Sequence, residues 1–462
     1  MITDSYSLLP NIQQVVHRAY DHYGQPVEST SDTGVYANTA SNMFRAYLTT
    51  RDRDLKLMTQ HDLEEYQKET KSLSVVTATR NFVKQTFEKV YNEDGLFSKV
   101  FDIEPMWHNS PDSAFQAIKA INTTMVHPGN LAPLASSIQS SLQAAELQAV
   151  CDVVGWLANE YSVAESDEED SPSSRKHREY AARLLVENLW PFTDNAFTAE
   201  ITKSISRASV PDSALKIGPV ENGVASSNAY PLVKRAVELL AMFDQAMPKE
   251  RSVSLRSAPK DSGLMRMQTK NSTVVFNIVR ETIQVLQRAE SRIKSLKSGT
   301  DADLFMVKNL LIVKNELVSL EIGDIRNHPA AMQHFGHIWD TLSPQHLVGF
   351  VSSFIGSSLW SRSAPTVTAK TLTAEDMSEQ LDELLRQSIY AFTKRWGTLI
   401  NDSQNRKTGV KPIAKVEAEL ESLLQNAFSN QPEVVAKLKE AIQLNVQAQS
   451  KAMDEKMGAK RY

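Results

Sequence analysis

The stretch VFNIVRETIQVLQRAESRIKSLKSGTDADLFMVKNLLIVKNELVSL, residues 275–320, decides the fold class of this chain. Its first part places an apolar residue at every third or fourth position, which is the pattern of an amphipathic helix. These apolar positions are Val275, Ile278, Val279, Ile283, Leu286, Ile293 and Leu296. Gly299 suits the left-handed C-cap of that helix, and Asp301 suits the N-cap of the next one. The stretch therefore predicts two antiparallel helices joined by a short turn.

Helical patterns also dominate on both sides of this stretch. Downstream, Thr373 with Asp376 resembles a capping box, and Pro412 and Pro432 each suit the first turn of a helix. Upstream, helices are expected at residues 11–20, 37–91, 110–124, 131–142, 145–161, 175–190 and 230–247. The β-branched run at residues 72–79 is interpreted as helical because helical patterns follow it.

These patterns predict an all-α protein, an elongated rod of consecutive helical bundles. No repeat with a period of roughly 20 to 50 residues is visible, so the tetratricopeptide, HEAT and ankyrin classes lack their signatures. The 16 glycines and 18 prolines are few for 462 residues, which favours long helices. The expected parts are a flexible segment at 1–36, a helical bundle at 37–207 with an acidic loop at 162–175, linkers at 208–271 around the helix 230–247, and a C-terminal helical bundle at 272–462.

Composition narrows the environment and the partners. Fifty basic and 55 acidic residues give a net charge of -5, so no global positive field favours nucleic acid. The single cysteine, Cys151, cannot form an internal disulfide, which fits the cytosol. The N-terminal residues 1–14 lack the basic start and apolar run of a signal peptide. The apolar stretch 346–360 is diluted by serines and too short to span a bilayer, so it predicts a buried helix.

No pattern in the sequence indicates a catalytic centre. The nucleophile elbow, the P-loop and the dinucleotide-binding glycine motif are missing. Cys151 lies on an apolar helical stripe, which favours a buried small side chain over a reactive thiol. Three histidines, His328, His334 and His337, lie close in sequence, but no carboxylate or cysteine stands at a matching metal-ligand spacing. The sequence therefore predicts no catalytic, cofactor-binding or metal-binding residue.

Two charged runs allow a second interpretation. The acidic run consists of Asp167, Glu168, Glu169 and Asp170. It resembles the magnesium-binding clusters of all-helical terpene synthases, but its serine and proline neighbours favour a solvated loop, in which Ser166 or Ser171 could be phosphorylated. The basic run consists of Arg175, Lys176, His177 and Arg178. It could contact acidic lipid or a partner, but as a charge run that opens a helix it is interpreted as a solvated face.

Two segments, taken in order, resemble the C-terminal half of subunit 3 of the conserved oligomeric Golgi complex. The segment 230–247, YPLVKRAVELLAMFDQAM, matches a Tyr-Pro followed by basic and leucine-rich turns. The segment 303–317, DLFMVKNLLIVKNEL, looks like the LFLIKHLLILRE-type helix of that family. Its matching positions are Leu304, Phe305, Lys308, Leu310, Leu311 and Ile312. A weaker similarity at 125–134 centres on His127, where the Arg-Pro of the family is missing, and the resemblance extends over residues 79–444.

The resemblance implies a non-enzymatic subunit of a multisubunit tether that captures retrograde vesicles at Golgi membranes. It implies as partners the sibling subunits, SNAREs, Rab GTPases and coat proteins, with peripheral membrane contact on the cytoplasmic side. The N-terminal coiled-coil half of the family has no counterpart here, so a fragment or a short form is expected. Three alternatives stay open: a subunit of another helical-rod tether such as exocyst, an all-helical metal-dependent synthase, and a generic helical scaffold outside membrane traffic.

Overall fold

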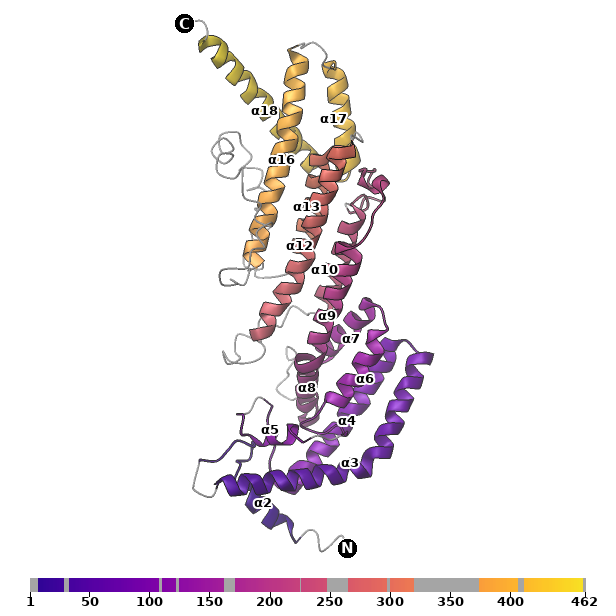
Figure 1. Cartoon of the computed structure of the whole chain (residues 1–462), viewed down its shortest axis with the longest axis vertical. Helices are drawn as coiled ribbons and strands as arrows, with labels where there is room; N and C mark the ends of the chain where they lie inside the picture. The colour runs from indigo at the N-terminus through magenta and orange to yellow at the C-terminus, as the bar shows by residue number, and fades with distance from the viewer. Residues whose placement is uncertain are drawn as a thin grey trace. The chain divides into compact units, whose positions relative to one another are not determined.

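A computed structural model shows an all-helical protein (Figure 1). It describes residues 7–28, 33–107, 110–121, 124–161, 171–224, 226–246, 265–296, 300–319, 374–405 and 411–459. Within these ranges there is no β-strand. Two isolated antiparallel β-bridges pair Tyr20 with Pro26 and His127 with Asn130. The all-α prediction is confirmed, and the helices pack mostly with their neighbours along the chain.

The chain divides into two compact units, which are described separately. Unit 1 comprises Met1–Phe197 and Met242–Gln268, and unit 2 comprises Thr198–Ala241 and Thr269–Tyr462. Two helices, α9 (Trp190–Ile201) and α10 (Pro231–Ala246), contribute residues to both units.

In unit 1, helix α4 (Val75–Phe101) is the element against which most others pack. Its partners are α2 (Leu9–His17), α3 (Thr33–Ser72), α6 (Ala132–Gln143), α7 (Leu147–Glu160) and α8 (Pro172–Leu184). The Ser74 side chain caps α4 by accepting a hydrogen bond from the Thr77 amide, and Asp102 ends it in the left-handed conformation with φ 55°. The break at Leu73 and Ser74 separates α3 from α4 and lies inside the β-branched run 72–79, which is helical from Val75 onward.

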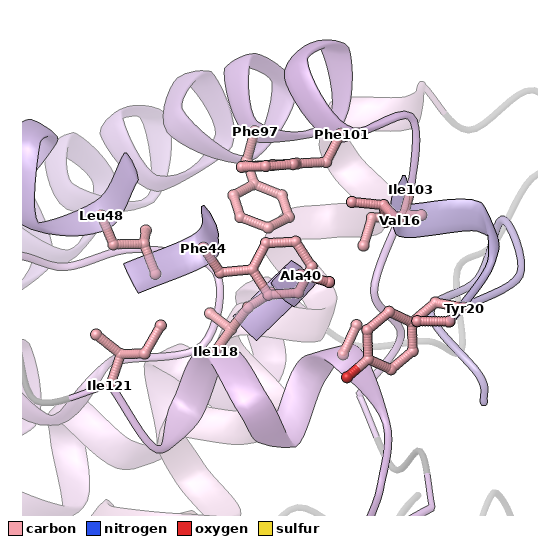
Figure 2. Close-up of a cluster of buried hydrophobic side chains, with 12 residues drawn as sticks. Val16, Tyr20, Ala40, Phe44, Leu48, Phe97, Phe101, Ile103, Ile118 and Ile121 are labelled. Carbon is pink, nitrogen blue, oxygen red and sulfur yellow. The ribbon is translucent and has the colours of Figure 1, made fainter. Parts of the chain in front are cut away.

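A cluster of buried side chains joins α2, α3, α4 and α5 (Ala114–Lys119) in unit 1 (Figure 2). At its centre, Phe44 contacts Phe97 and Phe101 with ring centroids 5.3 and 4.9 Å apart. Tyr20 stacks on the other side of Phe44 at 6.2 Å. Because buried aromatic rings contribute large apolar areas, this cluster fixes the N-terminal residues onto α3 and α4.

Several expected helices have different bounds in the structure. The helix expected at 11–20 is α2, and the helical region expected at 37–91 comprises α3 and α4 and extends to Phe101. The helix expected at 110–124 is the short α5, which begins after the Ser113 cap, whose Oγ accepts from the Gln116 amide. The helix expected to end at Trp190 continues through a π-helical turn, η1 (Leu185–Leu189), into α9. The π turn precedes Pro191, a residue without an amide hydrogen, and such turns accommodate irregular bonding inside a helix. A second π turn, η2 (Thr202–Ser206), follows α9.

Unit 2 is built around α13 (Ala302–Ser319), whose side chains are buried on nearly every side. It packs against α16 (Ala374–Gln404) and α17 (Ile413–Phe428), and α18 (Pro432–Ala459) covers α16. Figure 1 shows α13 and α16 side by side. A helix that is apolar all round needs partners on several faces, and these helices supply them.

The caps predicted for unit 2 are confirmed where the structure describes them. Asp301 Oδ1 accepts hydrogen bonds from the Asp303 and Leu304 amides, both at 3.1 Å, at the start of α13. Pro412 precedes α17, and Pro432 is the first residue of α18. The helix predicted from residue 275 is α12 (Met265–Leu296). Gly299, Thr373 and the predicted buried helix at 346–360 lie outside the described residues.

Candidate interaction sites

The two segments that carry the family resemblance contact each other in unit 2. The Tyr230 amide, at the start of α10, donates to Asn309 Oδ1 on α13 at 2.8 Å. The Tyr230 ring meets Phe305 edge-on, with centroids 5.4 Å apart. Buried amide hydrogens need an acceptor, and Asn309 supplies it to one of the orphan donors at the start of α10. The motif residues thus join two helices far apart in sequence.

Lys308 of the same motif faces the interior of unit 2. Its side chain is buried, and its Nζ lies 5.0 Å from the centre of the Phe428 ring on α17. Burial lowers the pKa of Lys308 to about 8. This motif position therefore connects α13 with α17 through a cation–π contact.

His127, the centre of the weaker similarity, is fully buried in unit 1. Its Nδ1 accepts a hydrogen bond from the Gly129 amide at 3.2 Å. Burial, followed by the nearby Arg183 charge, lowers the pKa of His127 to about 4, so the ring is neutral at neutral pH. Arg183 donates to the Pro128 carbonyl at 2.5 Å and stacks over Phe115 at 4.7 Å. The His127 turn is held in place by these contacts.

A cleft of about 480 Å³ opens in unit 1 between α4, α7 and the end of α10. It is lined by Arg80, Asp152, Gly155, Trp156, Asn159, Glu160 and Gln245. The Arg80 guanidinium and the Lys84 ammonium lie 5.4 and 5.6 Å from the centre of the Trp156 ring, and Lys84 pairs with Glu160 at 2.9 Å. The Nε–H of Arg80 is buried and has no hydrogen-bond acceptor among the described residues.

Gln245 of α10 lines one side of this cleft, and its side chain forms hydrogen bonds with Gln148 and Asp152 of α7. Gln148 and Gln245 both donate to Asp152 Oδ1, at 2.9 and 2.8 Å. Gly155 lies directly against the backbone of α10, because a Cβ at this position would be 2.4 Å from the Gln245 carbonyl oxygen. The absence of a side chain at Gly155 therefore permits this close approach. The cleft offers hydrogen-bonding and cation–π groups, which are suited to binding polar groups of a protein or a small molecule.

The interpretation of the basic run as a solvated face is wrong for two of its residues. Arg175 is exposed, but the side chains of Lys176 and His177 are only 23% and 13% exposed. Lys176 Nζ lies 3.3 Å from Asp94 Oδ2 on α4, and the Tyr180 hydroxyl donates to the same oxygen at 2.9 Å. Residues four apart share a helix face, so Lys176 and Tyr180 both face α4.

His177 lies among aromatic rings. Its neighbours are Phe87, Tyr91, Tyr161 and Tyr180, with ring centroids 5.9 to 6.4 Å away. Its Nε2 is 3.7 Å from Glu88 Oε1 at the edge of this group. The basic run is therefore partly an internal clamp between α8 and α4, and its sequence alone did not show which residues face inward.

Cys151 is buried in α7, as predicted from its apolar stripe. Burial, followed by the Asp152 charge, raises the pKa of its thiol to about 12, so the nucleophilic thiolate is not populated at neutral pH.

The other candidate groups lie outside the described residues. These are the acidic run Asp167–Asp170 and the histidines His328, His334 and His337. Among the residues that the structure does describe, no group of three or more His, Cys, Asp or Glu side chains is placed to hold a metal ion. Nor does any helix within them have the length and apolarity needed to cross a membrane.

The cleft residues were not predicted from the sequence. Arg80, Trp156 and Gln245 come from three helices, and each has the appearance of an ordinary helix-surface residue in its own segment. Trp156 in an otherwise aliphatic and polar helix was the one available signal, because tryptophan is enriched at binding sites.

Comparison with known protein families places the chain beside a described family. The family described as conserved oligomeric Golgi complex subunit 3, C-terminal, matches residues 2–338. That range contains the 230–247 and 303–317 segments and the His127 turn. No curated protein and no solved structure matches the chain.

Proposed function

This chain belongs to the family of conserved oligomeric Golgi complex subunit 3, and from this membership we propose that it is a non-enzymatic subunit of that tethering complex. The observation that carries the proposal is the family match over residues 2–338. The contact of Tyr230 with Asn309 supports it, because the segments that resemble the family most closely pack together as one structural element.

The proposed role is the capture of retrograde vesicles during Golgi trafficking. The chain acts through its sibling subunits and, as partners outside the complex, through SNAREs, Rab GTPases and coat proteins. In this proposal the chain works in the cytoplasm, bound peripherally to Golgi membranes. An all-helical architecture whose helices pack with their neighbours along the chain fits such a role, because it presents many helix faces and loops to partner proteins.

Affinity purification of the tagged full-length chain from its own cells tests the assignment. We expect the other subunits of the Golgi complex to co-purify with the tagged chain. A tagged unrelated helical protein serves as the control and should not recover them. Recovery of exocyst subunits without the Golgi subunits would assign the chain to the other tether and overturn the proposal.

The trafficking role needs a separate measurement. Acute depletion of the chain is expected to slow the return of a Golgi-resident cargo protein to its compartment, and the original sequence should restore the rate. Normal retrograde transport after complete depletion would contradict the role even if the chain co-purifies with the complex.

A further inference from the structure

Two loops of unit 1 are joined by backbone hydrogen bonds beside the Phe44 cluster. One comprises residues 19–28, and the other comprises residues 102–107 and 110–114. The Glu104 amide donates to the His22 carbonyl at 2.7 Å, and the Met106 amide donates to the Tyr23 carbonyl at 3.3 Å. The Ala114 amide donates to the Gly24 carbonyl at 2.9 Å. These bonds place Tyr23 and Met106 next to each other.

The first loop is also stiffened from within. Asp21 Oδ1 accepts hydrogen bonds from the amides of Tyr23 and Gln25, at 2.9 and 2.8 Å, which closes a tight turn. Gly24 has a φ of 74°, and a Cβ at this position would lie 3.3 Å from the Pro105 Cα. The turn therefore needs glycine, both for its backbone conformation and for its contact with the second loop.

Large apolar side chains project to solvent from this fastened pair of loops. Tyr23 is 54% exposed and Met106 is 50% exposed, and Val27 on the first loop is also exposed. The His22 ring packs edge-on against Tyr23, with centroids 5.3 Å apart. Tyrosine and methionine are enriched in protein interfaces, and a side chain held on a rigid loop loses little entropy on binding. We call Tyr23, Val27 and Met106, together with the exposed residues of the two loops, the Tyr23–Met106 surface.

The charged side chains that the two loops themselves contribute are predominantly acidic. The two loops carry the exposed acidic residues Asp21, Glu28, Asp102, Glu104 and Asp112. Their described residues contain no lysine or arginine. The nearest basic residues outside the loops are Arg18, which stacks on Tyr36 at 5.4 Å, the exposed Lys99 on the last turn of α4, and Lys176 on α8, which interacts electrostatically with Glu104. The His17 ring lies 2.9 Å from Asp102. An exposed apolar pair on two loops that carry five acidic residues and no lysine or arginine is complementary to a cationic, partly apolar surface.

We propose that the Tyr23–Met106 surface binds a basic segment of another protein, with an apolar side chain of that segment seated against Tyr23 and Met106. Lysines and arginines of the segment face the surrounding carboxylates. The same carboxylates repel anionic lipid headgroups and phosphate backbones, so the occupant is a protein. The proposal does not depend on the tether assignment, because it rests on residues of unit 1 alone.

Selection from a displayed library of random 12-residue peptides on the purified full chain tests the proposal, and it requires no identified partner protein. The counter-selection uses the double variant Tyr23→Ser, Met106→Ser. Because both original side chains are exposed, the two substitutions should not affect folding. Leu57→Ser is the matched control, because Leu57 is 80% exposed on α3. Circular dichroism and thermal melting show whether the three proteins are equally folded.

Enriched peptides are expected to be basic, to contain an aliphatic or aromatic residue, and to bind the double variant at least about tenfold more weakly than the original chain. Leu57→Ser should bind them within about twofold. Glu104→Lys should weaken binding by a similar factor, and added salt should weaken binding to the original chain.

Three results would overturn the proposal. They are a selection that yields no enriched peptide, enriched peptides without basic residues, and peptides that bind the double variant as well as the original chain. The last experiment measures binding of the chain to phosphatidylserine vesicles. Vesicle binding that is lost in the double variant would show that the surface binds membrane instead of protein.

Discussion

The amide of Tyr230 donates to the side-chain oxygen of Asn309, 79 positions further along the chain, at 2.8 Å within the interior of unit 2. Asn309 is further held by its own Nδ2, which donates to the Phe305 carbonyl at 2.9 Å. The start of α10 is thereby fixed to the middle of α13. The family resemblance rests on the same two segments, so this contact gives a physical reason for their pattern.

Replacing Asn309 by leucine should destabilise unit 2 by about 1–3 kcal/mol, because the buried Tyr230 amide loses its acceptor. Urea denaturation followed by circular dichroism measures the change. Asn426→Leu is the matched control, since Asn426 is exposed on α17 in the same unit. Equal stabilities of the two variants would show that the Tyr230–Asn309 bond contributes nothing to folding.

Replacing Gly155 by alanine should destabilise unit 1 by about 1–3 kcal/mol, because the new Cβ would overlap the Gln245 carbonyl oxygen. Gly95→Ala in α4 is the opposite case: its Cβ would meet nothing within 4 Å, so the helix should gain about 0.5–1 kcal/mol. Thermal melts of both variants provide the measurement. A Gly155→Ala protein as stable as the original would mean that α7 and α10 can separate at no cost.

The His127 ring should make folding pH-dependent. Its pKa in the folded protein, about 4, lies below the ordinary value of 6.5, so the unfolded chain binds more protons between these values. Stability is therefore complete above about pH 6.5 and falls as pH drops towards 4. The part due to His127 is about 2 kcal/mol between pH 7 and pH 5.

Unfolding free energies of the original chain and of His127→Asn, compared at pH 7 and pH 5, isolate this contribution. The variant should lose less stability on acidification than the original chain, whereas His61→Asn, at an exposed position on α3, should behave like the original. An unchanged pH dependence in His127→Asn would contradict a neutral, buried His127.

Replacing Asp94 by alanine should cost about 3–5 kcal/mol, because the Tyr180 hydroxyl loses its acceptor and the largely buried Lys176 loses its closest carboxylate, keeping only Glu179 at 3.7 Å. Glu440→Ala on α18 removes an exposed ion pair with Lys437, formed at 3.4 Å, and should cost less than about 1 kcal/mol. Chemical denaturation compares the two. If the Asp94 variant loses no more than the Glu440 variant, the α8–α4 clamp is not a stabilising contact.

Much of the fold follows from local patterns in the sequence. The apolar stripe from Val275 to Leu296 and the Asp301 cap predicted α12 and the start of α13, and the structure confirms both. Cys151 was placed correctly as a buried side chain on the same grounds. These features depend on the spacing of residues along one helix, which the sequence displays directly.

The polar contacts between helices could not be predicted in this way. The basic run looked like a solvated face because four adjacent charges on a helix point in different directions, and only the position of α4 shows that Lys176 faces Asp94. The π turn before Pro191 was missed for a related reason, since residues 175–190 carry no local signal for a change in hydrogen-bond spacing.

The sequence by itself determined that the chain is helical, which faces of its helices are apolar, and which family its two motif segments resemble. Only the tertiary structure decided that Tyr230 meets Asn309, that Arg80 and Lys84 lie over Trp156, and that Tyr23 lies beside Met106. The physical reason is one of range. Helix periodicity arises from hydrogen bonds four residues apart, whereas contacts between distant segments depend on how whole helices pack, and no short stretch of sequence contains that information.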